Sequence, residues 1–508
     1  MEGNRASREM GRRGVRSIQG SRRQFLTVAG GTTAALFAAA CGGNSNNAKP
    51  SGAATTAATR AAAAASSSAA AASTSTSAPA AVATTPSAPV KVSTVTYFGG
   101  DNAPEEVAWH TKFDADFTAA FPQYKVESAE YSATADFYPK LQTALATNSA
   151  PDLIFKNSAG QDLPTLWDQG VLAPVNDVME DIYKAVGGKD KFSKASVDRF
   201  TLPTGELIGV PMLGNPHVMW YRADLFQAAG LTPPADGHWD WTFLLKAVKA
   251  VHKPPQVYGL AIPLGRTQSV YYDIGSHILG NGGHFVSQDL KDVVFDSPET
   301  RDALDLIKEL SQYTPPGATT WGNPDQVNAL SQGTCAMGQY AGRVFAEIFN
   351  KNPSLIGKMS NALMPYNKVP RAWGGTAAHG LLKVGKNLQG AKDLAKFSMT
   401  KEQYISFALT APGFYSFAIP AYGIDPSYTN DKVLKAFDPK MLAIMSDTEK
   451  NFADFVSEGP GWKTNPKSGA LAGSLFLADV VQKVVIGKES SQSAATFGAQ
   501  QVRDIMKG

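Results

Sequence analysis

The sequence predicts an α/β protein with two lobes, carried by a chain of 508 residues. Three observations lead to this prediction. Short apolar strands alternate with amphipathic helices through residues 91–508, an order typical of sheets covered by helices on both faces. This body of 418 residues is too long for one hydrophobic core, since single cores rarely grow beyond roughly 250–300 residues. The body contains no run of about 18 consecutive apolar residues, so it should contain no membrane span.

Residues 1–41 have the pattern of an export signal. Arg22 and Arg23 precede an apolar run of small residues that is too short to span a bilayer. The paired arginines resemble the twin-arginine export signal. Cys41 follows three alanines, as in a lipobox, where the cysteine is lipidated and becomes the mature N-terminus; Ala38 stands where Leu is usual. The alternative is an ordinary cleaved signal with a chance cysteine.

Residues 42–90 are predicted to be a disordered tether. Between 51 and 90 there are 18 Ala and 15 Ser or Thr and no aromatic residue, so the segment cannot bury enough apolar surface to fold. As a coil, about 50 residues span roughly 40 Å. The first 90 residues also carry the positive charge: the net charge of the whole chain is +3, whereas residues 91–508 alone carry −4. A body with this balance is not expected to bind nucleic acid.

The body opens with strands and helices in alternation. Residues 92–98 are rich in β-branched and aromatic residues and end in a turn at 99–102. Apolar residues at helical spacing predict helices at 107–121 and 136–145. Residues 125–127 form a second strand, and 151–155 form a short apolar strand of the kind buried in parallel sheets.

The alternation continues to the end of the chain. Ser297 and Pro298 stand at the N-cap and first turn of a helix that should reach residue 310. The other predicted strands are 205–211, 218–221 and 258–262, and the other predicted helices begin at 223, 243, 391, 401 and about 471.

Common catalytic motifs are absent from the sequence. It contains no His-Glu-x-x-His, no Gly-x-Ser-x-Gly and no Gly-x-x-x-x-Gly-Lys-Ser/Thr, and its seven histidines never pair at metal-ligand spacing. We therefore expect no catalytic residue, no cofactor and no metal site. If Cys41 is acylated, Cys335 has no partner for a disulfide and is expected to be a small buried residue.

Eight short motifs follow one another in order along residues 91–508. The most specific of them lie at 205–211 and 220–226, and others lie at 170–175, 332–337 and 374–397. Each motif alone is weak, but together they resemble family 1 of the extracellular solute-binding proteins. The chain departs from the family pattern at Arg343, where an aromatic residue is common, and at 238–242, where His-Trp-Asp-Trp-Thr replaces the usual Pro-x-Thr-Trp.

The resemblance implies a two-lobe periplasmic-binding-protein-like (type II) fold with a hinge, similar to maltose-binding protein. It implies a receptor, not an enzyme, that captures a sugar between its lobes and delivers it to the permease subunits of an ABC importer. The protein would be a monomer on the outer face of the cytoplasmic membrane, held there through Cys41. We expect residues 91–212 and 338–398 to form lobe 1, and 213–337 and 399–508 to form lobe 2. The chain would cross between the lobes near 212–215, 337–340 and 398.

Sugar sites combine flat aromatic faces with polar groups that hydrogen-bond hydroxyls. In open α/β sheets such sites lie beyond the carboxyl ends of the strands. Close backbone approach to a ligand also favours glycine, as in the pair at 374–375. The candidate ligand-binding residues are Phe98, Asp101, Asn102, Asn157, Ser158, Asn215, Trp239, Gln339, Tyr340, Arg343, Trp373, Gly374, Gly375, Thr376 and Trp462.

Other interpretations stay open at this point. An aromatic residue at a strand end belongs to the core about as often as to a binding site, and Asp101 with Asn102 can simply form a turn. The chain can also be a secreted two-domain hydrolase whose acid pair is not recognisable. A third interpretation keeps the binding fold for another polar solute, such as glycerol phosphate, for which Lys156 and Arg343 would supply positive charge.

Overall fold

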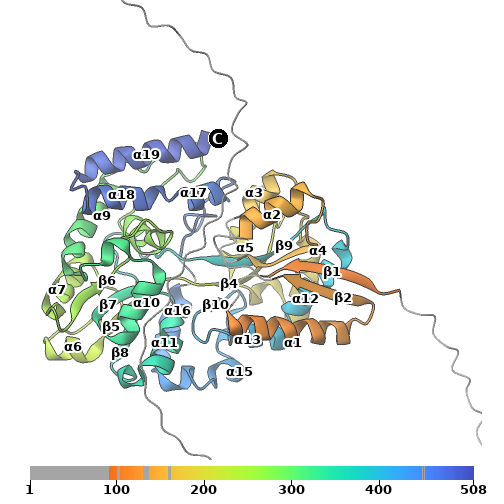
Figure 1. The fold of residues 1–508 in the computed structure, drawn as a ribbon, viewed down its shortest axis with the longest axis horizontal. Helices are drawn as coiled ribbons and strands as arrows, with labels where there is room; N and C mark the ends of the chain where they lie inside the picture. Colours follow the sequence, from red (N-terminus) through yellow and green to blue (C-terminus); the bar gives the residue numbers. More distant parts are fainter. Residues whose placement is uncertain are drawn as a thin grey trace, which may run out of the picture. The chain divides into compact units, whose positions relative to one another are not determined.

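The computed structural model describes residues 91–99, 103–129, 137–157, 162–448, 450 and 452–507. The predicted signal (1–41), including Cys41, and the predicted tether (42–90) lie outside these residues. In the described body the strands form two separate sheets, each with its own helices (Figure 1). The predicted α/β class with two lobes is confirmed, and we call the lobe of the first sheet the first lobe.

Six strands form the sheet of the first lobe, in the order β10-β4-β9-β3-β1-β2. Strand β1 runs parallel to β2 and β3, whereas β9 is antiparallel to β3 and β4, and β10 is antiparallel to β4. The strands are β1 (Ser93–Phe98), β2 (Tyr124–Ala129), β3 (Leu153–Asn157), β4 (Val210–Gly214), β9 (Thr376–Leu381) and β10 (Ser416–Phe417).

Aromatic packing holds the helices of the first lobe to its sheet. The predicted helix at 107–121 is found as α1, and its Phe113 lies 5.4 Å from the ring of Phe155 on β3 and 4.6 Å from Trp109. The helices are α1 (Pro104–Ala120), α2 (Phe137–Ala146), α3 (Leu163–Asp168), α4 (Asn176–Val186), α5 (Lys194–Arg199), α12 (Leu388–Ser398), α13 (Lys401–Ala408), α14 (Pro420–Gly423) and α15 (Pro426–Thr429).

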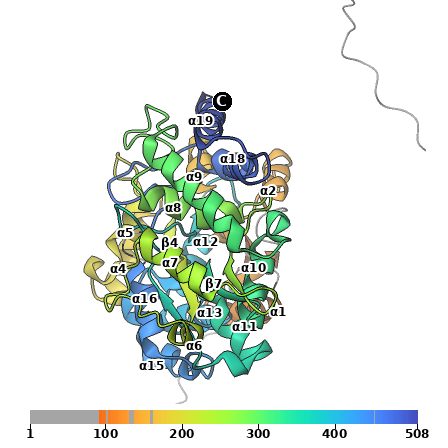
Figure 2. The same ribbon diagram turned by 90° about the vertical axis from the view of Figure 1, so that its left-hand side faces the viewer.

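Four strands form the sheet of the second lobe, in the order β6-β7-β5-β8. Strand β6 is parallel to β7, and β5 is antiparallel to β7 and β8. Helices α7 (Trp241–Val251) and α10 (Asn323–Gln332) pack against β6 and β7 (Figure 2). The strands are β5 (Val218–Arg222), β6 (Tyr258–Ala261), β7 (Cys335–Tyr340) and β8 (Met359–Ala362).

The predicted helix after Ser297 is found as α9, and Ser297 caps it by accepting a hydrogen bond from the Thr300 amide at 3.2 Å. The segment Tyr271–Gly275 (η2) is a π-helical turn, which leads directly into α8. The other helices of the second lobe are α6 (Ala223–Ala228), α8 (Ser276–Gly280), α9 (Pro298–Leu310), α11 (Arg343–Lys351), α16 (Pro439–Thr448), α17 (Ser468–Ser474), α18 (Phe476–Val485) and α19 (Ser491–Lys507).

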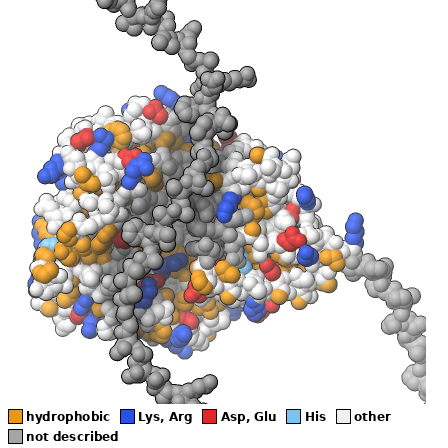
Figure 3. Space-filling model, in the orientation of Figure 1, with side chains coloured by type: hydrophobic (Ala, Val, Ile, Leu, Met, Phe, Trp, Pro, Cys, Tyr) orange, Lys and Arg blue, Asp and Glu red, His pale blue; other side chains and the backbone are white. Residues whose placement is uncertain are grey.

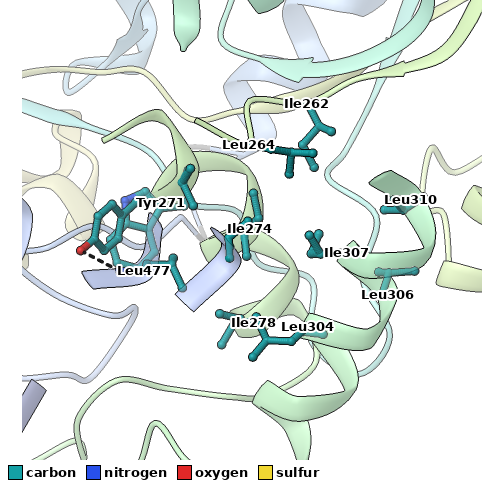
Figure 4. Close-up of a cluster of buried hydrophobic side chains, with 14 of the residues drawn as sticks. Ile262, Leu264, Tyr271, Ile274, Ile278, Leu304, Leu306, Ile307, Leu310 and Leu477 are labelled. Carbon is teal, nitrogen blue, oxygen red and sulfur yellow. Dashed lines mark hydrogen bonds between the residues drawn. The ribbon is translucent and has the colours of Figure 1, made fainter. Parts of the chain in front are cut away.

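The core of the second lobe joins η2, α8, α9 and α18 (Figure 4). Ile274 and Ile278 face Leu304 and Ile307, and all four are fully buried. Tyr271 accepts a hydrogen bond at its hydroxyl from the Leu477 amide, at 3.4 Å. This packing fixes the π-helical turn, and therefore the direction of the residues on it.

One helical stretch, Ser468–Val485, is long and apolar enough to cross a membrane by length and composition. Half of it is buried inside the protein. Leu477, Val480 and Val481 belong to the core of the second lobe. Core packing therefore accounts for the apolar composition of this stretch.

The chain passes between the two sheets three times. It leaves the first sheet after β4 and enters the second at β5, so this crossing lies at 214–218, close to the predicted position. It returns between β8 and β9, and crosses again between β10 and α16, whose residues pack in the second lobe. The crossing expected at 337–340 falls inside β7, and the one expected at 398 falls at the end of α12.

The segments predicted for single lobes therefore contribute to both sheets. Residues 338–398 include β8 of the second sheet as well as β9 of the first. Residues 399–508 include β10 of the first sheet as well as the last helices of the second lobe. The division of residues 91–508 into two lobes stays a proposal, and we draw it by sheet membership below.

Candidate functional site

Three chain segments lie side by side between the two lobes. Segment 372–376 is central: the amides of Asn215 and His217 donate to the carbonyls of Gly375 and Trp373, at 3.0 and 3.2 Å. On the other side, the Gly374 amide donates to the Ala453 carbonyl at 2.8 Å. Segments 214–218 and 372–376 carry two of the chain crossings, and 452–454 lies beside them within the second lobe; we call all three the crossing segments.

The glycine pair of the central segment is needed for this close packing. A Cβ atom on Gly374 would lie 2.6 Å from the Phe452 ring and 2.9 Å from the Cα of Pro216. A Cβ on Gly375 would lie 2.4 Å from Oδ1 of Asn215 and 3.4 Å from the hydroxyl of Tyr272. The groups that approach these glycines closely are neighbouring chain segments, and the approach of a ligand to them stays a prediction.

Polar and aromatic side chains gather where the crossing segments meet the second lobe. Asn215 is half-buried, and its Oδ1 accepts a hydrogen bond from the Gly375 amide at 2.7 Å. Tyr272, also half-buried, lies nearly parallel to His217, with ring centres 4.8 Å apart. Tyr340 at the end of β7 packs on the same imidazole, at 5.1 Å. We call Asn215, Tyr272, Tyr340 and Gly375 the junction cluster.

A buried carboxylate holds His217 in place behind this cluster. Nδ1 of His217 lies 3.0 Å from Oδ1 of Asp273 on the π-helical turn, and Nε2 of Gln326 donates to the other oxygen at 2.5 Å. Burial raises the pKa of Asp273, and the interactions with His217 and Gln326 oppose this rise. The carboxylate thus fixes the ring on which Tyr272 rests.

A second buried network ties the first lobe to the crossing segments. The guanidinium of Arg199 on α5 forms an ion pair with Asp454 at 3.3 Å, donates to the Phe452 carbonyl at 2.9 Å and lies 4.0 Å from the centre of the Phe452 ring. Thr376 donates its hydroxyl to the same carboxylate, which also accepts the Val456 and Ser457 amides at 2.9 and 3.0 Å. Burial raises the pKa of Asp454, and Arg199 and the hydrogen bonds oppose this rise.

The lobes also meet at the start of α11. The Arg343 guanidinium lies 5.0 Å from the centre of the Phe414 ring in the first lobe. A Cβ on Gly342 would lie only 1.6 Å from the Gly413 carbonyl oxygen, so the two backbones are in direct contact. The neighbouring Tyr415 donates its hydroxyl to Glu106 at 3.2 Å. Arg343 is therefore at the boundary between the lobes, and its contact with a ligand stays a prediction.

Several other candidate residues lie in the core of the second lobe. Trp239 and Trp373 are completely buried, Trp239 against Phe226 and Trp373 against Phe455. Neither offers a ring face to a ligand in this structure. Gln339 is also fully buried, and its Nε2 lies 2.5 Å from Nε2 of His277.

The remaining candidates lie apart from the junction cluster or outside the described residues. Phe98 is half-buried at the end of β1, on an open depression next to α2. Trp462 is half-buried and stacks on His284 at 4.2 Å. The backbone of Asn157 ends β3, but its side chain is not among those described. Asp101, Asn102 and Ser158 lie outside the described residues.

Sequence reasoning missed four residues of the two networks: Arg199, Tyr272, Asp273 and Asp454. A signal for Asp454 exists, because it is a single acid within the apolar run Phe-Ala-Asp-Phe-Val. A charge in such a run is buried and requires a partner. No comparable local signal marks Tyr272, whose position depends on the π-helical turn.

The described residues provide no reactive site through a metal-binding cluster or through the free cysteine. They contain no group of three or more His, Cys, Asp or Glu that could hold a metal ion. Cys335 is buried, as expected, and burial raises the pKa of its thiol to about 12. The thiol is therefore protonated and unreactive at neutral pH.

Comparison with known proteins agrees with this architecture. A putative ABC transporter periplasmic-binding protein of Escherichia coli, YcjN, is 21% identical over 309 residues, which cover 59% of this chain and 67% of that protein. A sugar transporter of Arthrobacter chlorophenolicus with bound laminaribiose superposes with a TM-score of 0.66 at 18% identity. Maltose-bound MalE3 of T. maritima superposes with a TM-score of 0.64 at 19% identity. Each superposition covers 81% of this chain and 99% of the solved structure.

At these identities the solved structures establish the fold, which is that of the two-lobe solute-binding proteins. The sequence pattern of one family extends across both lobes, from residue 100 to residue 405. That range includes two of the crossing segments and all four residues of the junction cluster. This chain belongs to the bacterial extracellular solute-binding proteins.

Proposed function

We propose that the protein is the receptor subunit of an ABC importer, which captures a mono- or oligosaccharide between its lobes and delivers it to a membrane permease. Family membership establishes the class of solute-binding protein. The transporter role is supported by the name of the relative YcjN, and the sugar class by the laminaribiose and maltose bound to two structural neighbours. The fold supports a binding protein over a hydrolase.

The junction cluster is the observation that carries this proposal. Tyr272 supplies a partly exposed aromatic ring, and Asn215 and the Gly375 backbone supply amide groups beside it. A sugar ring presents apolar C–H faces to aromatic rings and hydroxyls to amides. Because Asn215 and Gly375 lie on crossing segments, a ligand bound there contacts the parts of the chain that connect the lobes.

The charge distribution favours a neutral ligand. Acidic and basic side chains are interspersed over the part of the face that Figure 3 shows in colour, without a large patch of one sign. The body as a whole carries a net charge of only −4. Such a surface does not steer polyanions, whereas a neutral sugar needs no steering field.

We draw the lobes by sheet membership for this mechanism. The first lobe comprises 91–214 and 376 to about 430, and the second comprises 218–362 and 439–507. The three crossing points then act as a hinge, and closure over the ligand excludes water from its hydrogen bonds. Among the described residues, we propose Asn215, Tyr272, Tyr340, Arg343 and Gly375 as ligand-facing, whereas Phe98 and Trp462 lie apart from this group and stay predictions.

Titration calorimetry against a panel of mono- and disaccharides tests this function. We expect saturable binding of at least one sugar without formation of any product. Tyr272→Ala should weaken that binding at least tenfold, and Tyr272→Phe should weaken it less because the ring remains. The matched control is Tyr313→Ala, which removes a half-buried tyrosine that packs on His252, away from the cluster.

Two outcomes would overturn the proposal. Release of cleaved product would identify a hydrolase, and binding of glycerol phosphate but of no sugar would identify the other solute class. In the second case Arg343→Ala should abolish binding, because a phosphate requires the guanidinium. Tryptophan fluorescence supplies an independent readout, since closure changes the surroundings of the eight tryptophans.

We also propose that Cys41 anchors the protein to the outer face of the cytoplasmic membrane after twin-arginine export. The support is the sequence pattern at 22–41. Metabolic labelling with palmitate should mark the wild-type protein and not Cys41→Ser. Replacement of both Arg22 and Arg23 by Lys should block export, and unchanged export would contradict the twin-arginine assignment.

A further inference from the structure

A cavity of about 670 Å³ lies where the cores of the two lobes meet. Helix α5, strand β10 and helices α14 and α15 of the first lobe supply one side of it, and α16 of the second lobe supplies the other. The described residues that line the cavity include none from the crossing segments. The cavity is therefore separate from the junction cluster, although Gly413 and Tyr415, which line it, also belong to the contact between the lobes at the start of α11.

The interior of this cavity is apolar. Phe417, Leu434, Phe437 and Met445 line it and are almost completely buried. Ile424, by contrast, lines it while 77% exposed, the most exposed large apolar side chain among the described residues. An apolar interior that opens next to an exposed isoleucine favours a ligand with an apolar body.

All charged residues among the described lining are lysines: Lys194, Lys435 and Lys450. Lys194 pairs with Asp198 on α5 and Lys450 with Asp447 on α16, but neither aspartate lines the cavity. Exposed pairs of this kind are weak and exchange readily. The cavity thus combines an apolar interior with a positively charged lining and no acid.

We propose that this cavity binds an alkyl carboxylate of medium chain length, with the alkyl chain against Phe417 and Phe437 and the carboxylate among the three lysines. The volume lies within the range of roughly 300–1,000 Å³ typical of small-molecule sites. Alkyl burial drives the binding, and the lysines select an anionic head over a neutral one. This site is independent of the proposed carbohydrate function.

Calorimetric titration of the full chain with decanoate, below its micelle concentration, tests the proposal. We expect one saturable site per chain. Affinity should rise about fourfold per methylene from octanoate to dodecanoate, as expected from the transfer of methylene groups out of water. The neutral alcohol 1-decanol should bind at least tenfold more weakly; equal affinity would overturn the role of the lysines.

Two variants with matched controls place the ligand in this cavity. Ala443 is exposed on α16 and lines the cavity, so Ala443→Trp fills it and should weaken decanoate binding at least tenfold. Ala119→Trp, at an exposed position of α1, is the control for the added ring. Lys435→Glu should weaken binding similarly, whereas Lys432→Glu makes the same change in charge at a residue that does not line the cavity.

The outcomes separate this site from the carbohydrate site. Decanoate that binds with unchanged affinity to both Ala443→Trp and Lys435→Glu would lie elsewhere, and the proposal would be overturned. Absence of saturable binding to the wild-type protein would overturn it as well. Sugar binding, measured on the same variants, reports on the proposed function whatever the result with decanoate.

Discussion

Arg199 and Asp454 bind each other in a part of the molecule that water hardly reaches. Their side chains are 4% and 2% exposed. Such a pair requires many hydrogen bonds to offset desolvation. Asp454 obtains them from Thr376 and two backbone amides, and Arg199 from the Phe452 carbonyl. The pair therefore joins the first lobe to segment 452–454 through a buried, hydrogen-bonded contact.

Arg199→Ala should destabilise the protein by about 3–5 kcal/mol at pH 8, because it leaves the Asp454 carboxylate buried without its cation. Burial already raises the pKa of Asp454, and loss of Arg199 raises it further. A raised folded-state pKa gives stability that is present at low pH and lost as pH rises through it. The variant should therefore lose less stability at pH 5 than at pH 8 in urea unfolding.

The pH dependence separates this explanation from a simple packing defect. A packing defect costs the same free energy at both pH values. The control is Arg199→Ala in an Asp454→Asn background: with no titrating group at position 454, the loss caused by Arg199→Ala should be the same at pH 8 and pH 5. Equal losses for Arg199→Ala at the two pH values would contradict a charged Asp454.

At the scale of elements, helix α11 begins where the lobes touch. Its first residue, Arg343, stacks on Phe414, and Gly342 before it contacts the Gly413 backbone. Gly413 has φ +81°, a conformation that favours glycine. Both positions therefore require glycine, because the two backbones touch there and leave no room for a side chain.

Gly342→Ala should lower stability by at least 1–3 kcal/mol, the usual cost of overpacking, because its Cβ would clash with a carbonyl oxygen that cannot rotate away. Thermal unfolding followed by circular dichroism measures this loss. Gly473→Ala is the matched control: it lies within α17, and nothing lies within 4 Å of its added Cβ. Similar melting temperatures for both variants would show that the contact tolerates a methyl group.

The start of α9 gives a second prediction for an element. Ser297→Ala removes the acceptor for the Thr300 amide and should cost about 1 kcal/mol. Ser297→Asp keeps an acceptor at the same place and should retain most of the stability. Urea unfolding of the two variants measures the cap directly, and an equal loss in both would indicate that the side chain contributes through packing.

At the scale of the whole molecule, the weak net charge of the body predicts how binding responds to salt. A neutral sugar should bind with nearly the same affinity at 50 mM and 500 mM NaCl, because screening acts only on charged partners. We expect a change of less than twofold by calorimetry. A decrease of tenfold or more would indicate an anionic solute.

The fold was more accessible from the sequence than the site. Strand β3 is recognisable because its apolar run is buried in the middle of a sheet. Asn215 is predicted from the crossing that the family resemblance implies near 212–215, and Gly375 from the glycine pair; the structure places both on segments between the lobes. Trp239 and Trp373 were expected to face a ligand but pack in a core, since a large aromatic ring satisfies either environment. The junction cluster also depends on Tyr272, which tertiary packing places beside residues far away in sequence.

The three crossings also limit how such a protein can be rebuilt by exchange of gene fragments. Neither lobe corresponds to one continuous stretch of sequence, since each is assembled from two separated stretches. A single recombination point anywhere within the body leaves at least one lobe composed of both parents. Transfer of an intact lobe from one relative to another requires three breakpoints, one at each crossing. Chimeras joined at fewer points will contain a lobe whose core combines side chains from two different parent proteins.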